Sequence, residues 1–179
     1  MKPLLLSLIL LIPFPCWARL NETFEQSVAR YGEAISGSIR DVTPDCRQAE
    51  FWKDSIWIRE SFLKGTCVQI EFAHASARPT SSADVAFPPI GTPFFTEGEI
   101  QTLLDQNSQG HHWSDAKRVT SDSGVSIRCW GRDDGAFASE ADFQMFSVKL
   151  PAFDDYTAAC DAANLAKEKI AAQSALKNL

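Results

Sequence analysis

The stretch that carries the clearest structural pattern is SIWIRESFLKGTCVQIEFA, residues 55–73. Two runs rich in β-branched and aromatic residues, 55–62 and 66–73, are separated by a short turn that ends at Gly65. In the second run apolar and polar residues alternate, so one face of that strand is buried and the other is wet. The stretch therefore predicts a β-hairpin.

The sequence before the hairpin predicts a helix and then a loop. Residues 21–31 begin with the polar caps Asn21 and Thr23, carry acidic residues in the first turn and stop at Gly32, which is typical of a short amphipathic helix. Residues 33–50 contain glycine, proline and scattered polar residues, and we expect a long loop there that holds Cys46.

The sequence after the hairpin predicts the remaining elements. The proline-rich stretch 75–93 is expected to be a surface loop, and Thr96 with Glu99 forms a capping-box pattern that opens a second helix. Three strands are expected at 125–130, 136–140 and 143–150. A third helix is expected from about Asp154, with Tyr156, Cys160, Ala163, Ala166 and Ile170 along one face.

The order of these elements favours the α+β class. Because the strands follow one another through short turns without crossover helices, we expect an antiparallel sheet of two hairpin or meander units, with short helices packed on one face and a C-terminal helix. Helix, hairpin, helix and meander resemble one unit used twice. Residues 19–170 are expected to form a single domain, and 171–179 a frayed or projecting helix end.

The N-terminus predicts export. Residues 1–18 contain one lysine, a short apolar stretch and small residues before Arg19, the pattern of a cleaved secretory signal peptide. The apolar stretch is too short to span a bilayer comfortably, so no stable membrane span is expected after cleavage. Phe14 and Pro15 fit lipid attachment at Cys16 badly. The expected location is therefore the periplasm or the medium.

Composition and charge exclude several classes of protein. The chain has 179 residues, 45% of them hydrophobic, and a formal charge of -6 that becomes -7 once Lys2 is removed with the signal. This composition disfavours collagen, coiled coil, multi-span membrane protein and wholly disordered chain. The negative field makes nucleic acid and anionic membrane surfaces poor partners.

Four cysteines remain after signal cleavage, and an even number in an exported chain predicts two disulfide bonds. They are Cys46, Cys67, Cys129 and Cys160. Three connectivities are open, and the spacing favours one local pair in each half of the chain, Cys46 with Cys67 and Cys129 with Cys160.

Two stretches resemble small uncharacterised exported proteins of bacteria. They are FEQSVARYGEAI at 24–35, followed by the hairpin, and FTEGEIQTLLDQNSQGHHW at 95–113. The first also resembles the helix and hairpin that open SmpA/OmlA-like envelope domains and β-lactamase-inhibitor-like repeats. This resemblance implies an α+β envelope domain that binds other molecules and has no catalytic machinery.

The candidate functional residues are aromatic and histidine side chains. Trp52 and Trp113 lie in less regular segments and are the preferred partner contacts, whereas Trp57 and Trp130 lie in strand patterns and are expected in the core. His111 and His112 are further partner-binding candidates. A metal site is not expected, because adjacent residues of an extended segment point to opposite sides and no HExxH or CxxC spacing is present.

These patterns favour a non-enzymatic binding or accessory module that contacts a protein or another envelope component and needs no cofactor. No catalytic residue is predicted, since nucleophile elbows, phosphate-binding loops and dinucleotide fingerprints are all missing. The alternative is a small periplasmic or secreted hydrolase or metal-dependent enzyme that uses His111, His112 and Asp115. A third hypothesis is an accessory protein whose C-terminal helix docks on another chain.

Overall fold

The computed structural model describes residues 19–81, 93–120, 124–141 and 144–177. The expected signal peptide, residues 1–18, and most of the expected loop 75–93 lie outside the described residues. In chain order the elements are α1 (Phe24–Tyr31), β1 (Arg40–Thr43), β2 (Cys46–Lys53), β3 (Ile56–Leu63), β4 (Thr66–His74), α2 (Glu97–Gln106), β5 (Lys117–Thr120), β6 (Ser126–Gly131), β7 (Phe137–Ala141), β8 (Met145–Lys149) and α3 (Pro151–Lys177).

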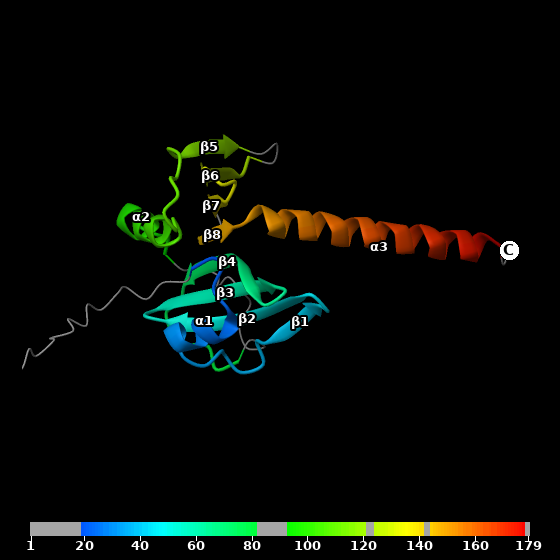
Figure 1. Cartoon of the computed structure of the whole chain (residues 1–179), viewed down its shortest axis with the longest axis horizontal. Coiled ribbons are helices and arrows are strands. Elements are labelled where there is room, and N and C mark those ends of the chain that lie inside the picture. The colour runs from blue at the N-terminus through cyan, green and yellow to red at the C-terminus, as the bar shows by residue number, and fades with distance from the viewer. Residues whose placement is uncertain (1–18, 82–92, 121–123, 142–143, 178–179) are drawn as a thin grey trace, which may run out of the picture.

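All eight strands form one antiparallel sheet in the order β1-β2-β3-β4-β8-β7-β6-β5, so the α+β class is confirmed. Strands β1 to β4 make one half and β5 to β8 the other, and the halves meet where β4 pairs with β8 (Figure 1). In that pairing Phe72 lies opposite Phe146 and Ile70 lies opposite Val148. The central seam therefore joins segments far apart in the sequence.

Both short helices begin with a capping box. In α1 the Thr23 side chain accepts a hydrogen bond from the backbone N–H of Gln26, and the Gln26 side chain accepts one from the backbone N–H of Thr23. Thr96 and Glu99 form the same pair of hydrogen bonds in α2. Helix α1 begins at Phe24 because its N-cap Thr23 is extended, with φ -83° and ψ 164°, and Asn21, with a φ of 64°, is left-handed and lies outside the helix. The cap at Thr96 and Glu99 confirms the predicted start of the second helix.

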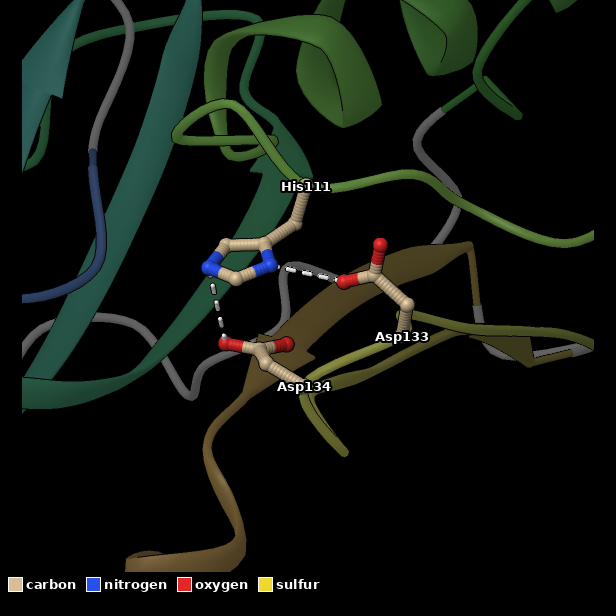
Figure 2. A group of neighbouring side chains, drawn as sticks. All are labelled: His111, Asp133 and Asp134. Carbon is tan, nitrogen blue, oxygen red and sulfur yellow. Dashed lines mark hydrogen bonds and ion pairs between the residues drawn. The ribbon is translucent and has the colours of Figure 1, made fainter.

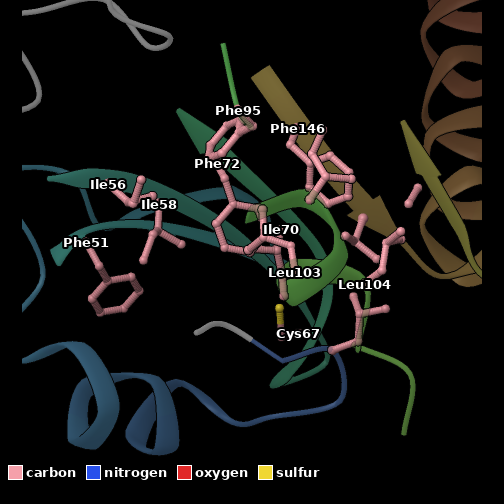
Figure 3. Packing of buried hydrophobic residues seen from close by; sticks show 14 of the residues in the cluster. Phe51, Ile56, Ile58, Cys67, Ile70, Phe72, Phe95, Leu103, Leu104 and Phe146 are labelled. Carbon is pink, nitrogen blue, oxygen red and sulfur yellow. The ribbon is translucent and has the colours of Figure 1, made fainter. Parts of the chain in front are cut away.

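The largest buried cluster lies on one face of the sheet and crosses the seam. Phe72 and Phe146 lie at its centre, with ring centroids 6.3 Å apart, and Phe95 and Leu103 pack with them (Figure 3). Side chains of α1 join the same cluster, since the Tyr31 ring lies 5.4 Å from the Phe51 ring. Trp130 belongs to it as well, as expected.

The loop prediction for residues 33–50 was wrong, and one further strand was not predicted. Residues 33–50 are not one long loop, because β1 and the first part of β2 lie there, joined by a turn at Pro44. Every residue of β2 pairs with β3, and that partner stabilises a segment with a weak pattern of its own. Strand β5 was not predicted either. Its four residues are all exposed, and they adopt the strand conformation because they pair with β6.

Helix α3 begins at Pro151, earlier than predicted, because proline is well accommodated in the first turn of a helix. The predicted buried face is only partly covered: Tyr156 and Cys160 are half-buried, whereas Ile170 is 64% exposed. From Asp161 onward every side chain that is described is exposed, and the helix extends away from the sheet (Figure 1). No helix within the described ranges has both the length and the hydropathy needed to cross a membrane.

Candidate functional site

The largest described cavity is an open groove on the outer face of β5, β6 and β7, opposite the face that carries Trp130. Alternation along these strands directs Val119, Ile127 and Phe137 outward, with Val119 directly opposite Ile127. The cavity measures about 820 Å³. We call it the β5–β7 groove; it is lined by His112, Ser114, Lys117, Val119, Ile127, Cys129, Gly131, Arg132, Asp133, Phe137 and Ser139.

The floor of the groove is apolar and open to solvent. Val119 is 55% exposed, and Ile127 and Cys129 are half-buried. A sheet face made of such residues would ordinarily be covered by another layer of structure. The floor is therefore the kind of surface that binds apolar groups.

The rim of the groove joins two segments through backbone hydrogen bonds. Ser114 N–H donates to the Gly131 carbonyl oxygen at 2.8 Å, and Asp133 N–H donates to the His112 carbonyl oxygen at 3.1 Å. The Ser114 hydroxyl in turn accepts from Gly131 N–H at 3.0 Å. Residues 112–114 are thus attached to the turn after β6 and keep their position beside the groove.

Arg132 holds this rim from inside the protein. Its side chain is fully buried, and its Nε and Nη2 donate to the two carboxylate oxygens of Asp134 at 2.7 Å each. Its Nη1 donates to the Asn107 carbonyl oxygen at the end of α2. The guanidinium hydrogen bond is the main cause that lowers the pKa of Asp134 to about 2. Arg132 therefore ties α2 to the β6–β7 turn.

Trp113, predicted as a partner contact, makes its main contacts inside the domain. Its indole Nε1 donates to the Leu104 carbonyl oxygen at 2.8 Å, and the Arg132 guanidinium lies 5.4 Å from its ring centroid. Trp52 is half-buried in a different cluster, against Ile35 and Trp57. The two predicted tryptophan contacts therefore do not lie together, and neither lines the groove.

His111 lies between two carboxylates on the exposed side of the rim (Figure 2). Its Nδ1 is 2.7 Å from an oxygen of Asp133, and its Nε2 is 3.8 Å from an oxygen of Asp134. The His112 backbone N–H is the first cause of the lowered pKa of Asp133, and the His111 side chain lowers that pKa further. The His111 ring therefore contacts both carboxylates of the β6–β7 turn.

The alternative hypothesis, a small hydrolase or metal-dependent enzyme, uses His111, His112 and Asp115, and the structure does not bring these three residues together as one metal-compatible group. A metal ion would take one ligand atom from each residue, and the candidate atoms of His111, Asp133 and Asp134 lie within 4.8 Å of one another. Asp134 already accepts two hydrogen bonds from Arg132. Within the described ranges the metal-compatible group consists of His111, Asp133 and Asp134, without His112 or Asp115. His112 instead lines the groove.

The four cysteines are all free thiols in the structure. The locally favoured pair Cys46 and Cys67 is incompatible with the sheet register, because Cys46 lies opposite Leu63 on one side of β3 and Cys67 lies opposite Phe62 on the other. Two strand spacings separate them by about 10 Å, beyond the Cα distance of about 7 Å that a disulfide can bridge. Cys129 lines the groove, far from Cys160 on α3.

One buried carboxyl group was not anticipated from sequence. Glu60 of β3 is fully buried on the core face beneath α1, and burial raises its pKa to about 8 against a weak opposing effect of the Ser27 hydroxyl. A polar residue between Ile58 and Phe62, both at buried positions of a strand, is the signal that could have identified it. It lines none of the described cavities.

Comparison of the chain with protein-family models, with curated proteins and with solved structures finds no match. The functional assignment therefore depends on the groove and its rim.

Proposed function

We propose that this chain is an exported, non-enzymatic binding module and that its β5–β7 groove receives an apolar side chain of a partner protein in the bacterial envelope or medium. The single observation that carries the proposal is the open apolar floor formed by Val119, Ile127 and Phe137. Apolar surface gains free energy when it leaves water, about 25 cal/mol for each Å² that is buried.

The rim supports a binding role because its hydrogen bonds are already formed without a partner. Arg132 is satisfied by Asp134 and by the end of α2, so the groove wall needs little reordering on association. His112, Lys117 and Asp133 surround the apolar floor with groups of both signs, which resembles the polar border of protein interfaces. In this proposal the two halves of the sheet carry their short helices on the same face, and the part of the other face over β5, β6 and β7, which α3 does not cover, stays open for binding.

The location of the partner site can be tested by photocrosslinking in the native envelope. A benzophenone amino acid is placed at Val119 or, as a matched control, at Val42 of the opposite edge strand, which is 50% exposed compared with 55% for Val119. We expect a discrete crosslinked protein from position 119 that position 42 does not produce. Equal products from both positions, or no product from either, contradict the proposal.

The crosslinked protein is then purified, and its affinity for the V119D and V42D variants is measured by calorimetry. An aspartate in the groove puts a charge against the apolar group of the partner, and we expect V119D to weaken binding by about tenfold or more. V42D is expected to change the affinity by less than about twofold. Unchanged binding by a folded V119D variant would place the interface elsewhere.

A further inference from the structure

The first turns of α3 enclose a second cavity against β1 and β2. It measures about 560 Å³ and lies at the opposite end of the sheet from the β5–β7 groove. The Tyr156 hydroxyl is hydrogen-bonded to the Thr43 hydroxyl at 2.8 Å across it. The Phe153 ring packs beside Tyr156 with centroids 6.4 Å apart. These contacts place the start of α3 over the β1–β2 end of the sheet.

Two thiols line this cavity from different elements. Cys46 is the first residue of β2 and is 2% exposed, and Cys160 lies one helical turn after Tyr156 on the same side of α3. Both thiols interact with the Tyr156 hydroxyl, and they interact electrostatically with each other. The sequence between them contains most of the domain, so this proximity is a product of the fold.

The other two cysteines are placed where they cannot form a disulfide bond with Cys46 or Cys160. The Cys67 thiol faces the core, where it donates to the Gln69 carbonyl oxygen at 3.4 Å (Figure 3). Cys129 is on β6, five positions from β2 in the sheet, which at about 4.8 Å per strand is about 24 Å. Among the four described cysteines, Cys46 and Cys160 are therefore the pair that shares a cavity.

We propose that Cys46 and Cys160 form a disulfide bond that joins α3 to β2 when the chain meets an oxidant of the disulfide class, such as oxidised glutathione or a disulfide-bonded oxidoreductase. The bond fixes the first turns of α3 on the sheet and leaves the segment from Asp161 projecting at a set angle. In cells it depends on the export that forms part of the proposed function, because thiols in a reducing cytosol stay reduced.

The reaction follows from the accessibility of the two thiols. Cys160 is only half-buried, so its thiolate meets the oxidant first, attacks one sulfur of the oxidant's disulfide and releases the other as a thiol. The Cys46 thiolate then attacks the Cys160 sulfur of this mixed disulfide and releases the second thiol. The two protein thiols lose two protons and two electrons, and the oxidant's disulfide gains both.

The second step depends on ionisation of the buried Cys46 thiol. Burial raises the pKa of the Cys46 thiol, so little of it is thiolate at neutral pH. Loss of contact with water raises the pKa of Tyr156 to about 12, so its hydroxyl stays protonated and remains available as a hydrogen-bond donor to a thiolate.

The test is peptide mapping of the purified protein after incubation in oxidised and reduced glutathione, which does not require export. Trypsin releases Cys46 in DVTPDCR (41–47) and Cys160 in LPAFDDYTAACDAANLAK (150–167). We expect these two peptides to be linked without reductant and separate with it, and alkylation of Cys160 to fall by about tenfold or more on oxidation. The peptides of Cys67 and Cys129 are expected to remain unlinked.

The matched variants are C160S and C129S, since both cysteines are half-buried. C129S is expected to keep the link between 41–47 and 150–167, and C160S to lose it while its circular dichroism stays unchanged. A link between any other pair, or free Cys46 and Cys160 after oxidation of a folded chain, overturns the proposal. Because no partner is present, such a failure is distinct from failure of the groove assignment.

Discussion

The two halves of the sheet share an order of elements, a short helix followed by four strands, but differ in what they bury and what they leave open. The β1 end is covered by α3, whereas the β5 end carries the open groove. The half that contains α2 pairs its buried Arg132 with Asp134, whereas the half that contains α1 buries Glu60, for which no ion pair is found among the described residues. Two halves of similar topology therefore differ in exposure: one is covered by α3, and the other carries the exposed groove to which we assign binding.

The seam between the halves can be broken at Phe72, which is fully buried opposite Phe146. Phe72→Ala should lower the free energy of unfolding by about 4 kcal/mol, because a large cavity opens in the shared cluster. Urea denaturation measures this. Phe94→Ala, at a position 54% exposed, is the control and should change stability by less than about 0.5 kcal/mol. Two separate transitions in wild type would show that the halves unfold independently.

The rim of the open half depends on Arg132. Arg132→Ala should cost about 3 kcal/mol, because it leaves Asp134 and the Asn107 carbonyl oxygen without their buried donor. Arg118→Ala removes an exposed arginine that bonds only to the Ser126 hydroxyl among the interactions described, and should cost less than about 0.5 kcal/mol. Chemical denaturation of both variants compares them. Equal losses would mean that Arg132 does not hold the rim.

The closed half should be the pH-sensitive one because of Glu60. Its pKa is raised from 4.5 to about 8, so between these values the folded state holds a proton that the unfolded chain has lost, and stability falls as pH rises. Glu60→Gln should therefore become more stable than wild type as the pH rises from 4.5 to 8, by about 3 kcal/mol at pH 7, and the difference in the free energy of unfolding should then level off. Denaturation at several pH values measures the gap. A gap that is constant with pH would exclude this titration.

The smallest effect is expected at the contact that closes the β1 end. Tyr156→Phe removes the hydrogen bond to Thr43 and should cost about 1 kcal/mol. A double-mutant cycle with Thr43→Val isolates the pair, and the double variant should lose no more than Tyr156→Phe alone. Strictly additive losses in the cycle would show that the two hydroxyls stabilise the protein independently of each other.

How much the sequence predicted depends on how local each feature is. The helix caps at Thr23 and Thr96 and the strands expected at 55–62 and 66–73 follow patterns within a few residues, and the structure has these caps and has strands at Ile56–Leu63 and Thr66–His74. Strands β1, β2 and β5 were not, because their partners lie on neighbouring strands and supply the stabilisation. The candidate site divides in the same way. His112 was identified as a candidate from its residue type alone, whereas Val119 and Ile127 form the floor of the groove only because β5 pairs with β6.

By itself, the sequence determined the α+β class, the capped helices, the negative charge and the candidate residues, because each of these follows from composition or from near neighbours along the chain. Only the tertiary structure decided which residues meet. It places His111 with Asp133 and Asp134, and it brings Cys46 to Cys160 across most of the chain. Such contacts depend on strand order and on where α3 returns, and no spacing in a single sequence contains that information, since loop closure brings distant residues together at a cost that depends only weakly on their separation.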